Sequence, residues 1–374
     1  MKRLFCLILT FLIVIPVFKA SAVGTSAKAA VLINGDTGEI IYSHNPDKRL
    51  PMASTTKIMT ALLLCENGEL SREITVTPEM LRVEGSSMGL LGGDKVTLHD
   101  LLYGMMLASG NDAANVTAYI LGGTVDGFVK MMNDKAAELG LKNTHFDTPS
   151  GLDGESHYTT AYDLSLLARY ALQNEDFSKA AASKSATLCY GNPPYKRTLT
   201  NHNRLLKTFS GAVGVKTGFT KKSGRCLVTA AKRDGKFVIA VTLNDPNDWQ
   251  DHTALLQYGL NQVKLTEIKP ERQSVSIPVI GGVQQSITIS IPSATFSSLE
   301  NEQITSQINL PEFVYAPVSK GEKIGSVVYS KGDTVVKQTE LLSDNKITAK
   351  PPKRSFLQDF AENLRYIFLG IWEK

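Results

Sequence analysis

The feature that most constrains the fold is an apolar stretch at residues 58–65, with the sequence IMTALLLC. Its apolar side chains wrap around a helix instead of forming one stripe, and a helix of this kind is buried on all sides. The polar tract MASTTK lies directly before it, and Gly68 provides a C-terminal stop. The stretch predicts a central helix, and a chain of 374 residues has room for a sizeable core around it and for a second domain.

Helix and strand patterns are mixed from about residue 30 to residue 263. Residues 30–45 and 225–244 are predicted to form β-hairpins, because apolar runs flank a glycine-containing turn in each. Thr97 with Asp100 three residues later predicts a capping box at the start of a helix. The predicted helices span residues 97–109, 112–121, 126–139, 161–172 and 251–263.

After about Pro270 the pattern changes. The stretch QSVSIPVIGGVQQSITISI alternates apolar and polar residues on either side of Gly281-Gly282, and the chain continues in this manner beyond it. Short alternating strands with glycine turns and no helical period predict a small all-β domain.

The first 22 residues have the pattern of a secretory signal. A basic start is followed by an apolar run over residues 4–18, and the letters ASA at residues 20–22 are a small-x-small cleavage signal. The run is shorter than the ~20 residues that span a bilayer. A cleaved signal peptide is predicted, which places the mature chain outside the cytoplasm. A permanent N-terminal anchor is the alternative.

The last segment, residues 350–374, follows a Pro-Pro break and has a helical pattern of its own. Its apolar residues recur at spacings of three and four, namely Phe356, Phe360, Leu364, Ile367, Phe368 and Ile371. This pattern predicts an amphipathic helix that is too polar to span a membrane but is able to lie in its interface. The alternative is that the same apolar face docks on the protein body.

Charge and cysteine content exclude several classes of protein. The net charge is +4 and no cluster of lysines or arginines stands out, so no nucleic-acid partner is expected. Beyond the leader the chain has Cys65, Cys189 and Cys226, fewer cysteines than an exported protein built on disulfides carries. Cys65 and Cys226 lie in apolar segments and are predicted to be core residues. No Cys or His cluster has metal spacing, so neither a metal nor a cofactor is expected.

The tract before the central helix contains a candidate nucleophile. Ser54 lies three residues before Lys57, and this spacing puts both side chains on one helical face. A lysine removes a serine proton only when it is neutral, so burial and positive neighbours must lower its pKa from ~10.4. The buried helix that follows would enclose Lys57. The alternative is an N-cap serine with a lysine that snorkels to solvent.

The Ser-x-x-Lys spacing alone is not diagnostic, because residues 343–346 (SDNK) repeat it. The second copy lies in a polar stretch near the C-terminus, with no apolar helix behind it. We interpret it as a solvated turn.

Two further motifs support the first copy. The letters SGN at residues 109–111 fall in a break between predicted helices, where a hydroxyl and an amide can point into a cleft. The letters KTG at residues 216–218 end a strand-like stretch, where a cation and a hydroxyl could hold a carboxylate and the glycine lets a substrate approach the backbone. The letters KSG at residues 222–224 repeat this pattern in a polar turn, so we favour the first copy.

The three motifs in this order resemble the active-site set of penicillin-binding proteins and serine β-lactamases. In detail the chain is similar to the low-molecular-weight penicillin-binding proteins that act as D-alanyl-D-alanine carboxypeptidases, the S11 peptidase family. The matching stretches are PMASTTKIMTALL, GMMLASGNDAANVTA, TPSGLD, NHNRLL and GVKTGFT. The resemblance is specific from about residue 30 to residue 263 and weaker beyond it.

This resemblance implies a β-lactamase/transpeptidase-like mixed α/β domain, in which helices flank an antiparallel sheet. It divides the chain into a signal peptide (1–22), a D,D-carboxypeptidase domain (23–264), a β-rich domain (265–349) and a membrane-associating amphipathic helix (350–374). The implied location is the outer face of the cytoplasmic membrane, as a peripheral protein. The implied partners are peptidoglycan stem peptides and β-lactams, with no cofactor.

The resemblance also implies a mechanism on matching residues. Ser54 would attack the carbonyl between the two terminal D-alanines while Lys57 takes its proton, and an acyl-enzyme would form as the last D-alanine leaves. Ser109 would relay a proton to the leaving amine, and Asn111 would position Lys57 and the substrate amide.

The remaining implied roles belong to substrate binding. Lys216 and Thr217 would bind the terminal carboxylate, with Gly218 beside them. The backbone N–H groups of Ser54 and Phe219 would form the oxyanion hole.

Two departures from the family pattern stand out, and three other functions remain. Some relatives carry a basic residue beyond Lys-Thr-Gly that helps to hold the carboxylate, but NDPNDWQDHTALL offers no arginine. Ser150 stands where some relatives have histidine. A D,D-endopeptidase that cuts cross-links could use the same site, and a β-lactamase or a silent wall-binding protein are further alternatives.

Overall fold

The structure is a computed structural model that describes residues 23–300, 303–332 and 334–351, together with 357, 358, 360, 361, 364 and 365. The predicted signal peptide at residues 1–22 lies outside the described residues, as does most of the predicted amphipathic helix at 350–374. Within that last segment, the described residues 357, 358, 360, 361, 364 and 365 are helical. Within the described parts of the chain, no helix combines the length and the apolar content needed to cross a membrane.

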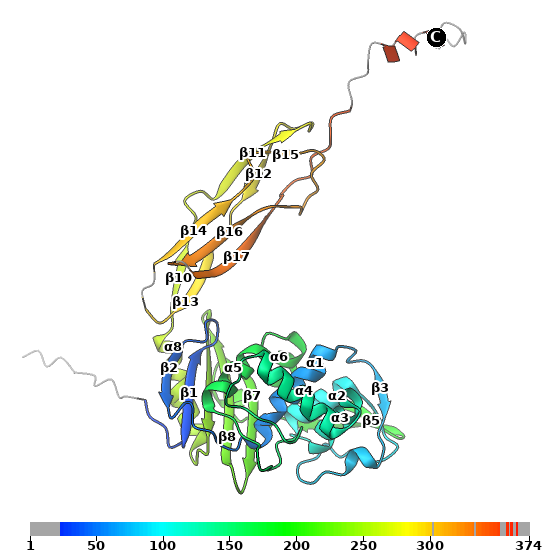
Figure 1. The fold of residues 1–374 in the computed structure, drawn as a ribbon, viewed down its shortest axis with the longest axis vertical. Helices are drawn as coiled ribbons and strands as arrows, with labels where there is room; N and C mark the ends of the chain where they lie inside the picture. The colour runs from blue at the N-terminus through cyan, green and yellow to red at the C-terminus, as the bar shows by residue number, and fades with distance from the viewer. Residues whose placement is uncertain are drawn as a thin grey trace, which may run out of the picture. The chain divides into compact units, whose positions relative to one another are not determined.

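The chain forms two compact units, of which the first ends at Val263 and the second begins at Lys264. A five-stranded antiparallel sheet lies in the first unit, with the order β2-β1-β9-β8-β7 (Figure 1). Its strands are β1 (Ala29–Asn34), β2 (Ile40–His44), β7 (Ala212–Thr220), β8 (Gly224–Arg233) and β9 (Lys236–Leu243). Both predicted hairpins are therefore present, and the pairing of β1 with β9 joins them into one sheet.

Both faces of this sheet are buried, because successive side chains of a strand point to opposite faces. Val31 and Ile33 of β1 pack into the large apolar cluster that the sheet forms with the helices. Leu32 faces α8 (Asp248–Gln262) on the other side, where a Cβ added at Gly259 would lie 3.0 Å from it. Burial on both faces explains why β8 and β9 are almost continuously apolar in sequence.

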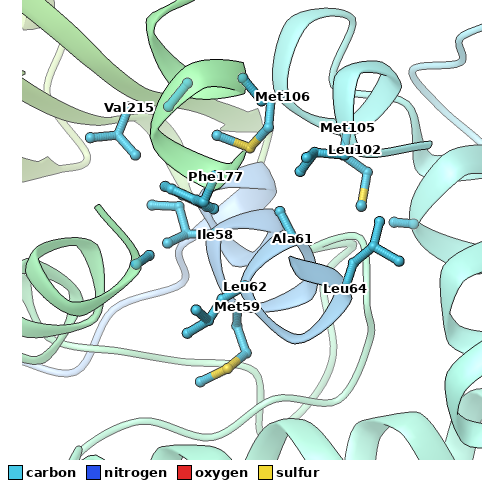
Figure 2. Close-up of a cluster of buried hydrophobic side chains, with 14 of the residues drawn as sticks. Ile58, Met59, Ala61, Leu62, Leu64, Leu102, Met105, Met106, Phe177 and Val215 are labelled. Atoms are coloured by element: carbon cyan, nitrogen blue, oxygen red, sulfur yellow. The ribbon is translucent and has the colours of Figure 1, made fainter. Parts of the chain in front are cut away.

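Helix α1 (Lys57–Asn67) is the predicted central helix, and every residue from Lys57 to Cys65 is buried. Figure 2 shows its side chains projecting in several directions into apolar surroundings. The neighbours drawn there are Leu102, Met105 and Met106 of α2, Phe177 of α6 and Val215 of β7. Gly68 caps the helix with a φ of 75°, a conformation that glycine adopts without strain.

The other helices of the first unit are α2 (Leu98–Leu107), α3 (Asn111–Gly122), α4 (Val125–Glu138), α5 (Ala161–Ala171), α6 (Glu175–Ala182) and the single turn α7 (Leu205–Thr208). The predicted capping box of Thr97 and Asp100 is present at the start of α2. Helix α8 begins at Asp248, three residues before the predicted start at residue 251. The acidic side chains of its first turn interact favourably with the helix dipole.

Two features of the first unit were not predicted. One is α6, whose eight residues bury only Phe177, Ala180 and Ala181. The other is a small sheet of order β3-β4-β5-β6. Its strands are β3 (Glu73–Thr75), β4 (Lys95–Thr97), β5 (Ser185–Gly191) and β6 (Pro194–Thr200), and they are short or largely exposed, so their apolar pattern is weak.

The second unit is all-β, as predicted. Its strands are β10 (Lys264–Ile268), β11 (Ser274–Ile280), β12 (Ser286–Ser290), β13 (Ala294–Ser298), β14 (Ile304–Asn309), β15 (Val314–Tyr315), β16 (Lys323–Lys331) and β17 (Thr334–Leu342). They pair in the orders β10-β13, β12-β11-β15 and β14-β16-β17. Ile277, Val279, Ile287 and Ile289 are buried, which is the alternation read from the sequence.

Candidate active site

Ser54 lies where the short 3₁₀ helix η1 (Ala53–Thr56) enters α1. The N-cap of η1 is Met52, so Ser54 does not cap this helix. Ala53 has a φ of 48°, a left-handed conformation that costs a residue with a Cβ on the order of 1 kcal/mol. A strained residue therefore stands immediately before the candidate nucleophile.

The side chain of Lys57 is fully buried, which rules out the snorkelling alternative. Its Nζ lies 3.0 Å from Ser54 Oγ, 2.7 Å from Asn111 Oδ1 and 2.6 Å from the carbonyl oxygen of Ser150. Burial, and next the positive charge of Lys216, hold the pKa of Lys57 well below its ordinary value, against a smaller opposing effect of Asp112.

Ser109 lies in the break between α2 and α3, as predicted, and Asn111 follows directly after this break. Ser109 has a φ of 56°, and Asn111 is the first residue of α3. The amide orientation of Asn111 is fixed because its Nδ2 donates to the carbonyl oxygen of Glu84 at 2.6 Å. Its Oδ1 is thereby left to face Lys57.

Lys216 and Thr217 lie inside strand β7, which runs on to Thr220 instead of ending at the Lys-Thr-Gly motif. The prediction of a strand end was wrong, because residues 217–220 keep pairing with β8. Lys216 Nζ donates to Ser109 Oγ and to the carbonyl oxygen of Thr217, each at 3.0 Å. Burial lowers the pKa of Lys216 to about 7.

Gly218 lies close against the backbone of η1. A Cβ added at Gly218 would lie 3.0 Å from the backbone nitrogen of Ser54 and 3.0 Å from the carbonyl oxygen of Met52. A side chain there would push the strand away from the serine. The next residue, Phe219, has 66% of its surface exposed.

A cavity of about 300 Å³ opens at this junction. Five predicted site residues line it: Ser54, Ser109, Thr217, Gly218 and Phe219. Lys57, Asn111 and Lys216 are buried behind it. Five lining residues were not among the predicted site residues: Ser86, His202, Arg225, Asp248 and Trp249. All of these residues belong to the first unit.

Arg225 is a cation at the cavity that was not among the predicted site residues. It is the second residue of β8 and pairs with Phe219, on the strand beside the Lys-Thr-Gly motif. One of its terminal nitrogens lies 3.0 Å from a carboxylate oxygen of the buried Asp248, and its guanidinium lies 5.7 Å from the centre of the Trp249 ring. The expected arginine is absent from the segment after β9, whereas Arg225 lies across the turn from β7.

Neither decoy motif is among the residues that line this cavity. Ser343 is buried and donates to the carbonyl oxygen of Asn345, while Lys346 is exposed, so that motif is a local turn. Lys222 is exposed and donates to the carbonyl oxygen of Gly154 at 3.0 Å. Within the described residues, no group of three or more His, Cys, Asp or Glu side chains is placed to hold a metal ion.

The chain is similar to known proteins along most of its length. A family described as D-alanyl-D-alanine carboxypeptidase matches residues 17–247, and one described as penicillin-binding protein 5, C-terminal domain, matches residues 266–349. D-alanyl-D-alanine carboxypeptidase DacF of Bacillus subtilis is 33% identical over 345 residues, which are 89% of this chain and 87% of that protein.

Similarity extends to a relative of different activity and to a solved structure. A D-alanyl-D-alanine endopeptidase of Pseudomonas aeruginosa is 32% identical over 203 residues, or 54% of this chain and 65% of that protein. The crystal structure of the D-alanyl-D-alanine carboxypeptidase DacD from Francisella tularensis superposes with a TM-score of 0.63 at 27% identity, over 92% of this chain and 98% of that one. The Ser54–Lys57 pair therefore lies in a chain that belongs to the S11 family of serine-type D-alanyl-D-alanine carboxypeptidases, the PBP5-like low-molecular-weight penicillin-binding proteins.

Proposed function

We propose that this enzyme removes the terminal D-alanine from peptidoglycan stem pentapeptides through an acyl-enzyme on Ser54. The observation that carries the proposal is the 3.0 Å contact between Ser54 Oγ and Nζ of the fully buried Lys57. A serine becomes a nucleophile when an adjacent base takes its proton, and burial supplies that base by favouring the neutral amine.

The three oxygen neighbours of Lys57 fit a neutral amine. The carbonyl oxygen of Ser150 and Oδ1 of Asn111 can only accept, and they use the two N–H bonds of a neutral lysine. The amine lone pair is then left for the hydroxyl hydrogen of Ser54. In this arrangement Asn111 and the Ser150 carbonyl orient the base, and the proton moves from Ser54 Oγ to Lys57 Nζ as the acyl bond forms.

The leaving amine and the oxyanion have their own candidate groups. Ser109 Oγ lines the same cavity as Ser54 and is held by Lys216, so we assign it the proton relay to the departing D-alanine. The close approach of Gly218 to Ser54 supports an oxyanion hole made by the backbone N–H groups of Ser54 and Phe219.

We assign the terminal carboxylate to Lys216, Thr217 and, as the second cation, Arg225. A lysine whose pKa is about 7 carries only part of a charge at neutral pH, whereas a guanidinium remains charged. Arg225 lines the cavity, and Asp248 and Trp249 hold its head group. It takes the place of the arginine that is missing from the segment after β9.

Acylation and product release test this function together. The mature protein is incubated with a labelled penicillin, its intact mass is recorded, and D-alanine release from a stem pentapeptide is assayed. We expect a penicillin adduct and D-alanine release, both lost in Ser54→Ala. The matched control is Ser343→Ala, because it removes the serine of the second Ser-x-x-Lys motif and is expected to keep both activities.

Other results would overturn this assignment. Fast penicillin turnover without an adduct would indicate a β-lactamase. An adduct on Ser54 with cleavage of cross-linked dimers but no D-alanine release would indicate the endopeptidase, an activity that the Pseudomonas relative carries in its name. If neither an adduct nor D-alanine release is observed, every enzymatic function is excluded and a silent wall-binding protein remains.

We further propose the predicted location and boundaries. A signal peptide of residues 1–22 exports the chain, residues 23–264 carry the activity, residues 265–349 form the β-rich domain, and residues 350–374 bind the membrane surface. The apolar spacing of the last segment supports this, and its described side chains Leu357 and Phe360 are 74% and 52% exposed. A chain that ends at Lys350 is expected in the soluble fraction and the full chain with membranes; equal membrane retention would contradict the anchor.

A further inference from the structure

A buried histidine behind the nucleophile has no part in the chemistry described so far. His157 lies in the segment before α5 and is only 4% exposed. Its Nε2 is 2.7 Å from Thr56 Oγ1, on η1, and its Nδ1 accepts from the backbone N–H of Asp147 at 2.9 Å. The ring thus joins two segments that both contact the Ser54–Lys57 pair.

The hydrogen bonds fix which nitrogen carries the proton. The backbone N–H of Asp147 can only donate, so Nδ1 of His157 is unprotonated and Nε2 carries the hydrogen. Thr56 Oγ1 accepts from Nε2 and gives its own hydrogen to the carbonyl oxygen of Ala53, 2.8 Å away. The chain of donors runs in one direction, from Asp147 N–H to the Ala53 carbonyl.

One end of this chain holds the strained residue before the nucleophile. Ala53 has its φ of 48° in the left-handed region, and surrounding contacts must hold such a conformation in place. The carbonyl of Ala53 also faces Gly151, where an added Cβ would lie 1.9 Å from its oxygen. The hydroxyl of Thr56 and the backbone of Gly151 therefore fix the peptide that presents Ser54.

The other end holds the segment that orients the base. Asp147 begins the run of residues 147–152, whose Ser150 carbonyl accepts from Lys57 Nζ and whose Pro149 carbonyl accepts from Thr60 Oγ1, each at 2.6 Å. Nδ1 of His157 secures the start of that run. One ring thus supports both the turn that carries the nucleophile and the carbonyl that orients its base.

We propose that His157, as the neutral Nε2–H tautomer, is a positioning residue that aligns Ser54 with Lys57 through Thr56 and through the Asp147–Ser150 segment. The proposal rests on the acyl-enzyme function of Ser54 proposed above. Only this tautomer satisfies both neighbours, because a doubly protonated ring would turn a second donor toward the Asp147 N–H. His157 touches neither substrate nor the reacting atoms, so it acts on the rate of acylation and not on substrate binding.

The surroundings of the ring keep it in this form. Desolvation by burial lowers the pKa of His157 to about 4, against the opposing charges of Asp147 and Asp153. His145 on the same segment and Lys222 on the turn between β7 and β8 lower it further. Phe146 packs edge-on against the ring at 5.9 Å between centroids. The neutral ring is thus the working form throughout the neutral pH range.

Two substitutions of His157 each retain one of its two hydrogen bonds. His157→Gln places an amide near the position of Nε2 and is able to donate to Thr56, but it loses the acceptor for Asp147. His157→Asn places an amide oxygen near the position of Nδ1 and is able to accept from Asp147, but it no longer reaches Thr56. Thr56→Val removes the hydroxyl at nearly constant shape, and Thr56→Ser keeps it.

The test measures acylation of the full mature chain by a chromogenic cephalosporin in rapid mixing. This experiment separates the reversible dissociation constant from the first-order acylation rate. We expect His157→Asn and Thr56→Val to lower the acylation rate by about 10- to 100-fold, the scale of a misplaced reacting group, with the dissociation constant unchanged within about twofold. Thr56→Ser should restore most of the rate, and His157→Gln should lose less than His157→Asn.

Control variants separate a loss of positioning from a loss of folding. His145→Gln, at a half-exposed histidine two residues before Asp147, should behave as the unmodified protein. Unchanged acylation in folded Thr56→Val and His157→Asn would overturn the positioning role. A loss that appears in the dissociation constant alone would also overturn it. If His157→Asn does not fold, the pair Thr56→Val and Thr56→Ser decides the question alone. Failure of the proposed function is distinct, because the unmodified protein would then form no adduct on Ser54.

Discussion

At the scale of single residues, the candidate site is defined by two buried lysines, one beside Ser54 and one beside Ser109. Desolvation by burial lowers the pKa of each lysine, and the charge of Lys216 lowers the pKa of Lys57 further. Spacing along the chain predicted the pairing of Ser54 with Lys57. It did not predict that Lys216 would reach Ser109 behind the cavity, because that contact joins a loop and a strand over a hundred residues apart.

The charge of Lys216 gives the first prediction, a pH dependence. Its pKa is about 7, so the free enzyme loses this positive charge as the pH rises through that value. Binding of a substrate carboxylate weakens in the same range, so kcat/KM should fall on the alkaline side, while protonation of Lys57 causes the fall on the acid side. In Lys216→Arg the cation persists, and the alkaline limb should move upward by more than one pH unit. If the alkaline limb does not move, the titration of another group causes it.

Arg225 gives the second prediction. Its loss removes a charge-assisted hydrogen bond, worth about 1.5–3 kcal/mol, so Arg225→Gln should lower kcat/KM for a stem peptide by about 10- to 100-fold, mainly through KM. A peptide with a terminal carboxamide should be cleaved equally by both proteins. Arg204→Gln is the matched control, since Arg204 lies over the same Trp249 ring at 5.8 Å. An equal loss on both substrates would assign Arg225 a structural role.

At the scale of elements, α8 is fixed to the sheet by a polar contact inside an apolar interface. Nδ1 of the fully buried His252 lies 2.6 Å from Thr229 Oγ1 on β8, and its Nε2 lies 2.9 Å from Thr242 Oγ1 on β9. Thr229 pairs with Ala240, two residues before Thr242, so the two threonines are diagonal neighbours on adjacent strands. The ring that contacts both of them sets the rotation of the helix over the sheet. Burial lowers the pKa of His252 to about 3.

This contact gives the third prediction, a loss of stability in acid. Unfolded histidine binds a proton near pH 6.5, but His252 in the folded chain does so only near pH 3, so unfolding takes up a proton between these values. Between pH 7 and pH 5 this group alone should remove about 2 kcal/mol from the free energy of unfolding.

Denaturant unfolding of His252→Gln checks this prediction. The variant should lose about 2 kcal/mol less than the unmodified protein over the same pH step, whatever its stability at pH 7. His44→Gln, at an exposed histidine, should lose as much free energy of unfolding between pH 7 and pH 5 as the unmodified protein does. An identical pH step in all three proteins would show that His252 does not titrate on unfolding.

Elements were predicted unevenly. Helix α1 and the β8–β9 hairpin were found because their apolar patterns are strong, and the start of α2 because its capping box is local chemistry. Strands β5 and β6 were missed because much of their surface is exposed. Neither a helical nor a strand period of apolar residues therefore stands out in their sequence. The Lys-Thr-Gly strand was taken to end too early because its polar residues face the cavity or a buried partner, not solvent.

At the scale of the whole molecule, every residue that lines the cavity belongs to the first unit. The fourth prediction follows: a chain of residues 23–263, expressed alone, should be acylated by a labelled penicillin within about threefold of the rate for residues 23–374, as expected of a domain with its own core. The adduct should lie on Ser54 in both. A loss above tenfold in a folded fragment would show that the second unit supports the site.

The sequence by itself determined the elements with strong periodicity, the order of three motifs and the candidate nucleophile among them. These features are local, because a side chain's period, cap and spacing depend on residues nearby in the chain. Only the tertiary structure decided that Lys57 is buried and not snorkelling, that Arg225 lines the cavity beside the Lys-Thr-Gly strand, and that His157 links Thr56 to the Asp147 segment. Burial and contacts between distant segments follow from how the sheet and helices pack, and this packing is what sets the charge state of the two lysines.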